Sequence, residues 1–311
     1  MIAPTKSRVQ RRTAGDNVWL SRAGDGGQAR LVSLSSHPVN YEVLDSEEAV
    51  GRAMLEELET LARDKSGDLT IILLGGRGAQ ALHRLLGQLA KTGEADQMLN
   101  RLNVFTQDAL APMRMDNSFS FVRDFERLLG EEFFSKVKSF TSMRTDTTDL
   151  EGELVHYLDT LESRGEIDLL FLGFGPEAGA ASHLAYIKPG SGAEASDLAG
   201  VIPVSSSILE HHITKFKAGG SRVSAGDEAE CRQASHILTL GPAAILLATR
   251  IVQSIVDADT APAKRASYHR LIETEIADDP KTRQQQLDEN PGLWIRLHPN
   301  VRSLILPNVL A

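Results

Sequence analysis

The 311-residue sequence contains a single cysteine, Cys231. No disulfide can therefore form within the chain, and this composition fits a reducing compartment. No apolar run approaches the roughly 20 residues that cross a bilayer, so we expect no membrane partner. The basic residues near the start are not followed by an apolar stretch, as a secretory signal would require. We therefore expect a cytoplasmic protein.

Positive charge is scarce, with 33 Lys and Arg against 42 Asp and Glu and a formal net charge of −9. Nucleic-acid surfaces depend on clustered Lys and Arg that neutralise phosphates, so this balance argues against a nucleic-acid partner. A small anionic metabolite is still compatible with the sequence, because a local pocket can be positive on an acidic protein. A homo-oligomer is compatible with it too.

Several common site motifs are missing. The first glycine-rich loop, at 75–78, is not followed by Gly-Lys-Ser/Thr, and no G-x-G-x-x-G opens its helix, which argues against Walker and dinucleotide sites. No G-x-S-x-G marks a serine hydrolase. His211 and His212 are adjacent rather than four residues apart and lack a metal-binding pattern, so we predict that they are surface histidines. We expect no metal or redox cofactor.

What the sequence does contain is an alternation of strand and helix patterns. Apolar runs typical of buried strands each precede a loop and a helical pattern. They lie at 69–74, 102–105, 167–172 and 236–240, and the helical patterns at 45–63, 80–91, 118–129 and 242–255. Such repeats predict an α/β fold, a Rossmann-like parallel-rich sheet with helices on both faces.

The pattern divides the chain into two parts. Residues 41–311 form one predicted α/β domain, and residues 1–40 form an N-terminal extension. Within the extension, apolar segments at 18–20 and 29–34 flank a turn-rich stretch at 23–27, which predicts a β-hairpin or a mobile arm.

The first strand-end loop holds Gly75, Gly76, Arg77 and Gly78. Glycines between a strand and a helix leave backbone N–H groups free to face an anion that binds at the positive end of the helix. Arg77 favours a phosphate or carboxylate. The alternative is a tight turn that binds nothing.

Two further loops hold titratable residues. Asp108 follows the strand at 102–105, the usual place for a general base in an open α/β sheet, although a capping or loop carboxylate would look the same. The glycine-rich segment 173–190 contains Glu177 and His183, a pair that could share proton transfer near neutral pH. Alternatively, His183 is an ordinary helix residue.

Taken in order, these segments resemble the glucosamine-6-phosphate deaminase/isomerase family and its relative, 6-phosphogluconolactonase. The segments that carry the resemblance are Leu73-Leu74-Gly75-Gly76, Phe105-Thr106-Gln107-Asp108, Asn117-Ser118-Phe119-Ser120-Phe121, His183-Leu184-Ala185-Tyr186-Ile187-Lys188-Pro189, Thr239-Leu240-Gly241, Ala263-Lys264-Arg265-Ala266 and Leu297-His298-Pro299-Asn300. The last of these and the phenylalanine pattern favour the deaminase branch.

The resemblance implies the roles of the site residues. Asp108 would be the base beside the sugar carbonyl, and His183, oriented by Glu177, would open the sugar ring. Gly75, Gly76, Arg77, Gly78 and Lys264 would bind the phosphate of a small-molecule sugar phosphate.

The sequence also departs from the family pattern. Arg77 and Gly78 replace small hydroxyl residues, and Ala109 and Lys188 stand where the deaminases carry glutamates. Pro176-Glu177 replaces Asn-Asp, with about four extra residues before His183. The resemblance therefore implies a protein of carbohydrate metabolism with a degenerate site. A non-catalytic sugar-phosphate sensor and a lactone hydrolase remain open alternatives.

Overall fold

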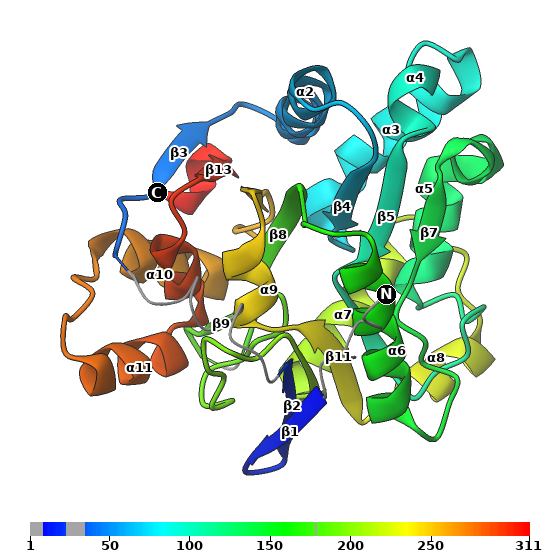
Figure 1. Ribbon diagram of the computed structural model, residues 1–311. Helices are drawn as coiled ribbons and strands as arrows, with labels where there is room; N and C mark the ends of the chain where they lie inside the picture. Colours follow the sequence, from blue (N-terminus) through cyan, green and yellow to red (C-terminus); the bar gives the residue numbers. More distant parts are fainter. Residues whose placement is uncertain (1–8, 23–34, 178) are drawn as a thin grey trace, which may run out of the picture.

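The computed structural model describes residues 9–22, 35–177 and 179–311. Its centre is a parallel sheet in the order β3-β13-β12-β8-β4-β5-β7 (Figure 1). The bounds are β3 Asn40–Val43, β13 Val301–Ile305, β12 Arg250–Ile255, β8 Leu169–Pro176, β4 Leu69–Leu73, β5 Leu102–Thr106 and β7 Ser139–Thr141. A short strand, β9 (Ser182–Leu184), runs antiparallel to β8. The predicted α/β class is confirmed.

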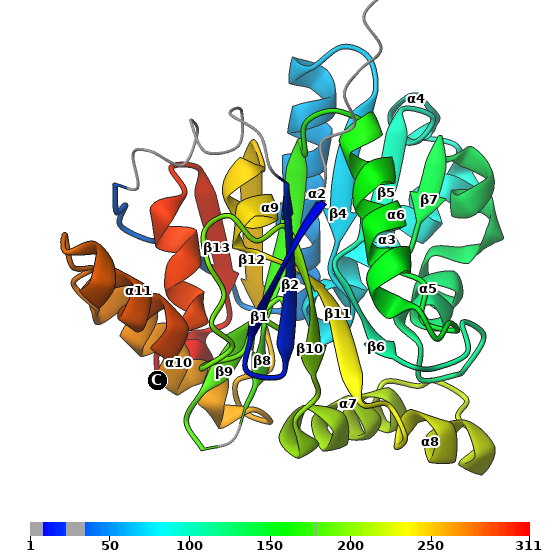
Figure 2. The ribbon, with the colours of Figure 1, turned by 60° about the horizontal axis from the view of Figure 1, so that its bottom comes forward.

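Helices lie on both faces of this sheet, and α7 and α8 lie across one end of it (Figure 2). The α-helices are α2 Glu47–Asp64, α3 Gln80–Thr92, α4 Asp96–Leu99, α5 Phe121–Lys136, α6 Leu150–Ser163, α7 Ser206–Ala218, α8 Ala225–Cys231, α9 Pro242–Leu247, α10 Pro262–Glu273 and α11 Pro280–Glu289. The 3-10 turns are η1 Arg77–Ala79, η2 Pro291–Leu297 and η3 Pro307–Val309. None of the described helices is long and apolar enough to cross a membrane.

The strand sequences explain why both faces are covered. Successive side chains of a strand point to opposite faces, and in β4 every residue is buried. Ile71 packs with the helices α2, α3 and α5, whereas its neighbour Ile72 packs with α6, α10 and the η2 turn. The continuous apolar run in this strand therefore serves two hydrophobic cores at once.

A second sheet, antiparallel throughout, has the order β1-β2-β10-β11-β6. Its strands are β1 Val9–Ala14, β2 Asn17–Arg22, β10 Ala199–Pro203, β11 His236–Leu240 and β6 Asp108–Ala111. The strand β2 pairs with β1 on one side and β10 on the other. The predicted second hairpin strand, at 29–34, falls outside the described residues.

One predicted element is wrong, and one predicted strand belongs to a different sheet than expected. The predicted helix 242–255 is a short helix, α9, followed by the central strand β12. The β-branched residues Ile251, Val252 and Ile255 form the strand because β8 and β13 pair with it on both sides. The predicted strand 236–240 does form, as β11, but it belongs to the antiparallel sheet, where it pairs with β6 in the segment predicted as a loop.

Candidate functional site

A cavity of about 90 Å³ lies where the carboxyl ends of four parallel strands meet α7 and α10. In an open parallel sheet, ligands bind at this edge. Its lining includes residues that follow β4 (Leu74, Gly75, Gly76, Arg77, Gly78) and β5 (Gln107, Asp108), and residues in the last part of β8 (Gly173, Phe174, Gly175) and in or after the end of β12 (Ser254, Asp257). It also includes residues of and beside β9 (His183, Ala185, Tyr186), residues of α7 (Ile208, His211, His212, Lys215, Phe216), and Phe121 and Lys264. The structure thus brings all but Glu177 of the predicted site residues to one cavity.

The glycine turn after β4 is shaped by close contacts. A side chain at Gly75 would place its Cβ 2.4 Å from the Phe121 ring, and one at Gly78 would place it 2.9 Å from the Ser254 hydroxyl. Gly76 has a φ of 80°, which favours glycine. The turn continues through η1 into α3, so it lies at the N-terminal end of a helical segment, where backbone N–H groups lack intrahelical partners. Glycine turns that precede a helix are common in anion-binding loops.

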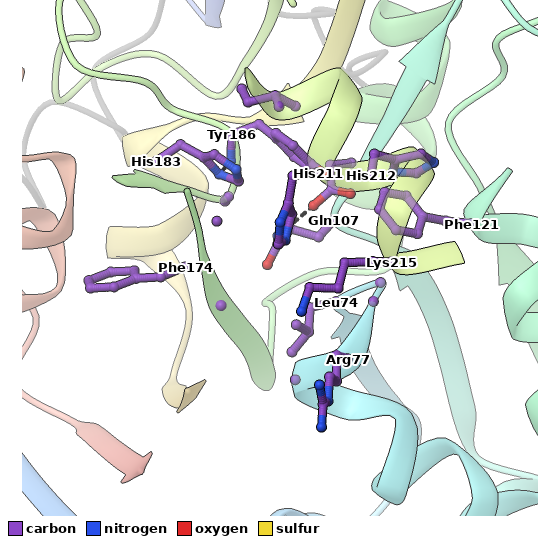
Figure 3. Close-up of a pocket in the computed structure, with 18 of the residues that line it drawn as sticks. Leu74, Arg77, Gln107, Phe121, Phe174, His183, Tyr186, His211, His212 and Lys215 are labelled. Carbon is purple, nitrogen blue, oxygen red and sulfur yellow. Dashed lines mark hydrogen bonds between the residues drawn. The ribbon is translucent and has the colours of Figure 1, made fainter. Parts of the chain in front are cut away.

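Arg77 lines the cavity but is already paired. Its Nε and Nη2 donate to Oε1 of Glu47 at 2.9 and 2.6 Å. Figure 3 shows the guanidinium turned away from the other labelled polar groups. Because 42% of the Arg77 side chain is exposed, the pair is largely screened by solvent. The positive charge of Arg77 is therefore already shared with Glu47 before any ligand binds.

Asp108 is buried beside the cavity. Its Oδ2 accepts a hydrogen bond from the side-chain amide of Gln107 at 2.5 Å, and among the described residues Oδ1 has no partner. Burial raises the pKa of Asp108 to about 7, and the Gln107 bond offsets only part of that effect. A carboxyl with such a pKa can both take and return a proton near neutral pH.

His183 is buried on β9 and stacks on Tyr186, with ring centroids 4.2 Å apart. Its Nδ1 accepts the backbone N–H of Tyr186 at 3.0 Å. Its Nε2 lies over Gly175, where a Cβ would come within 1.9 Å. Burial lowers the pKa of His183 well below its usual value, and the nearby Lys264 and His211 lower it further. The imidazole is therefore neutral at pH 7.

A group of charged side chains lies on the α7 and α10 side of the cavity. Lys264 Nζ donates to Asp257 Oδ1 at 2.5 Å, and Lys215 Nζ lies 3.4 Å from Asp257 Oδ2. Two ammonium groups thus share one buried carboxylate. Burial acts to raise the pKa of Asp257, but the two lysines outweigh it and the net shift is downward. Burial and Lys264 lower the pKa of His211 to about 4.

Glu177, which was predicted to orient His183, and Lys188 both have partners outside the cavity lining. Glu177 does not line the cavity; its Oε2 accepts a hydrogen bond from Ser205 Oγ at 2.9 Å. Lys188 Nζ donates to the carbonyl of Pro203 at 2.8 Å. The contact on Nδ1 of His183 is a backbone N–H rather than Glu177, because the turn after β9 folds back onto the ring.

Four further residues of the cavity were not predicted from the sequence: Gln107, His211, Lys215 and Asp257. The prediction that both histidines are surface residues is wrong, since His212 is buried with Nε2 2.7 Å from the Phe119 carbonyl oxygen and His211 lines the cavity. His211 and Lys215 are four residues apart, so they share one helix face, and that spacing was the available signal. No comparable signal marked Asp257, because its segment was predicted to follow a helix and not the strand β12.

Among the solved structures that resemble this chain are one deaminase and two lactonases. A monomeric glucosamine-6-phosphate deaminase has a TM-score of 0.67 at 18% identity, covering 87% of this chain and 98% of its own. The 6-phosphogluconolactonases of Trypanosoma brucei and Thermotoga maritima have TM-scores of 0.61 and 0.58 at 16% and 17% identity, covering 89% and 86% of this chain and 100% and 99% of their own.

This chain has the fold of these enzymes. The resemblance drawn from the sequence motifs is therefore confirmed for the fold, along nearly the full length of each enzyme. No family model and no curated protein matches the sequence.

Proposed function

We propose that the protein binds a phosphorylated sugar in this cavity and transfers a proton at the carbon next to its carbonyl group. The observation that carries the proposal is that the glycine turn at 75–78 and the buried carboxyl of Asp108 line the same cavity. One binds an anion and the other moves a proton, which are the two functions that such a substrate requires.

The phosphate would lie against the glycine turn. Backbone N–H groups at the start of a helix favour an anion, and the ammonium groups of Lys215 and Lys264 face the same cavity. These lysines share only one carboxylate, Asp257, so the three groups together carry one net positive charge. Arg77 would contribute less than the resemblance implies, because Glu47 already pairs with it.

Asp108 would act as the base. A carboxyl with a pKa of about 7 holds a proton more tightly than an exposed aspartate, and it is still half ionised at neutral pH. Gln107 fixes Oδ2, and Oδ1 has no partner among the described residues, so Oδ1 would be the oxygen that takes the proton.

The alternative is a non-catalytic sensor of the same ligand. The ion pairs of Arg77 with Glu47 and of Lys264 with Asp257 favour it, since a structural charge network would look similar. A lactone hydrolase would need His183 and a water molecule but no carbon base, so its turnover would be insensitive to Asp108→Asn.

The deciding experiment has two readouts on the full chain. In a thermal-shift series with glucosamine 6-phosphate, fructose 6-phosphate, 6-phosphogluconate and the unphosphorylated sugars, we expect only phosphorylated sugars to raise Tm, because ligands stabilise the state that binds them. Product formation from each ligand that binds, followed by NMR in wild type and Asp108→Asn, then separates enzyme from sensor. If no sugar phosphate shifts Tm, the proposal is wrong.

A further inference from the structure

The hydrogen bond on Nδ1 of His183 fixes which ring nitrogen carries the proton. A backbone N–H can only donate, so Nδ1 must present its lone pair to Tyr186. In a neutral imidazole the other nitrogen then carries the hydrogen. A carboxylate at the same position would have the opposite effect, because it would hold a hydrogen on Nδ1 and leave Nε2 as a base. The residue that contacts Nδ1 therefore decides what Nε2 can do.

The turn that supplies this N–H is strained. Leu184 and Ile187 exchange hydrogen bonds at 3.1 and 2.7 Å around Ala185 and Tyr186, whose φ angles are 48° and 60°. A two-residue turn with both φ values positive normally contains Asn and Gly, not a bulky aromatic residue. Thr239 Oγ1 donates to the Ala185 carbonyl and ties the turn to β11. Strain of this kind persists where surrounding structure enforces it, and it gathers at functional sites.

The groups around the ring oppose its protonation. Lys264 and His211 both disfavour an imidazolium. Burial acts in the same direction. The Nε2 edge is open because residue 175 has no side chain.

We infer that His183 is a fixed neutral donor, its Nε2–H held toward the cavity by the backbone of Tyr186, and that it polarises the carbonyl oxygen of an open-chain hydroxy-carbonyl sugar phosphate. This inference rests on the proposed function and narrows it. A neutral Nε2–H cannot take a proton from a ring hydroxyl, so His183 does not open a sugar ring as a base. Tyr186 is a positioning residue, and the substrate class is the open-chain aldose or ketose phosphate.

The step balances without a co-reactant. Asp108 takes the proton from the carbon next to the carbonyl, and the electrons of that C–H bond form the C=C bond of an enediolate. The former carbonyl oxygen gains negative charge and accepts the hydrogen bond from His183 Nε2–H. The hydroxyl proton passes to this oxygen, and Asp108 returns its proton to the former carbonyl carbon. The product is the isomeric sugar phosphate.

The test of the histidine state needs no substrate. Protein labelled with ¹⁵N in its imidazoles is examined by NMR between pH 5 and 8, and the His183 signals are assigned by their loss in His183→Gln. We expect a protonated Nε2 and an unprotonated Nδ1 throughout, unchanged in Tyr186→Gly, which keeps the backbone N–H. A protonated Nδ1 or an imidazolium at pH 7 would overturn the inference, whether or not sugar phosphates bind.

The test of the reaction uses fructose 6-phosphate in D₂O. Wild type should incorporate deuterium at the carbon next to the carbonyl, and Asp108→Asn should not. His183→Gln keeps an N–H donor near the position of Nε2, whereas His183→Leu has none. We expect His183→Leu to lower the exchange rate by about 10²-fold. The exchange rate of His183→Gln should be at least about tenfold higher than that of His183→Leu. Equal loss of exchange in both variants would overturn the donor role. The donor role would also be overturned if sugar phosphates raise the Tm of wild type but wild type catalyses no exchange. If sugar phosphates do not shift Tm at all, the proposed function is refuted instead.

Discussion

The two sides of the cavity differ in how their polar groups are held. On the β4 and β5 side, the glycine turn and Asp108 directly follow buried parallel strands, so the sheet itself sets their positions. On the other side, His183 depends on a strained turn, and Lys215 and His211 on a helix that crosses the end of the sheet. On the first side the predicted residues line the cavity, whereas on the second Glu177 lies outside the lining and a backbone N–H contacts His183. Residues placed by long-range packing can acquire new contacts more readily than residues placed by a central strand.

The largest expected effect is on turnover, and it tests the sheet side. Asp108→Asn keeps the shape of the side chain but cannot accept a proton from carbon. We expect kcat to fall by about 10²–10⁴-fold, the usual scale for one general base, with sugar-phosphate affinity little changed. Steady-state kinetics and a binding titration on the same preparation measure both. If turnover persists, the base lies elsewhere and the sheet side has no special role.

The next effect concerns Lys264 on the opposite side. Lys264→Met removes one partner of a buried ion pair, since the side chains of Lys264 and Asp257 are only 9% and 3% exposed. Breaking a buried pair costs about 3–5 kcal/mol, and here Lys215 remains to offset part of that loss. We expect a lower free energy of unfolding in urea and weaker phosphate binding. Lys281→Met, on α11, is a matched control that should change neither.

The double variant Lys264→Met/Asp257→Asn separates the two effects of that change. Removing both charges should restore most of the stability but not the affinity. Recovery of both would mean that the lysine binds no ligand.

The pH dependence of stability again tests Asp108. A folded-state pKa of about 7 lies above the unfolded value of 3.8, so the protonated carboxyl stabilises the fold at low pH. This contribution is lost as pH rises from about 4 to 7, and it is absent above 7. We therefore expect Asp108→Asn to gain stability relative to wild type as pH increases from 5 to 8, measured by Tm at each pH. A constant difference would show that the carboxyl is not buried.

The smallest expected effect is that of Arg77→Ala. Because Glu47 shares its charge and solvent screens the pair, we expect sugar-phosphate affinity to fall by no more than about 1 kcal/mol. Arg77→Ala/Glu47→Gln should restore that small loss. A loss of 2 kcal/mol or more in the single variant would place the guanidinium on the ligand and make the two sides of the cavity more alike than the structure indicates.

The two sides of the cavity also differ in how much of each could be predicted from the sequence. The strands at 69–73 and 102–106, the loops after them and the position of Asp108 follow from apolar runs and glycines, which act locally. The strand β12 was predicted as helix because the helix formers at 242–247 directly precede it, and only pairing with β8 and β13 reveals the strand. Without that strand, Asp257 could not be placed in the site.

The contact on His183 was beyond the sequence for a similar reason. His183 was singled out from the sequence and lines the cavity, but the partner of its Nδ1 depends on positive φ angles at Ala185 and Tyr186. Neither residue type favours positive φ angles, so no local sequence pattern predicts this turn.

The hairpin of β1 and β2 limits how the chain can be shortened. Trp19 is fully buried and its indole N–H donates to the Ser191 carbonyl at 3.0 Å, while Arg12 pairs with Asp197. A cloned fragment that begins at residue 41, where the α/β pattern starts, would uncover a tryptophan-sized hole and an unpaired edge on β10. For expression work, a fragment should therefore start no later than Val9. A tag should be added before the hairpin and should not replace it.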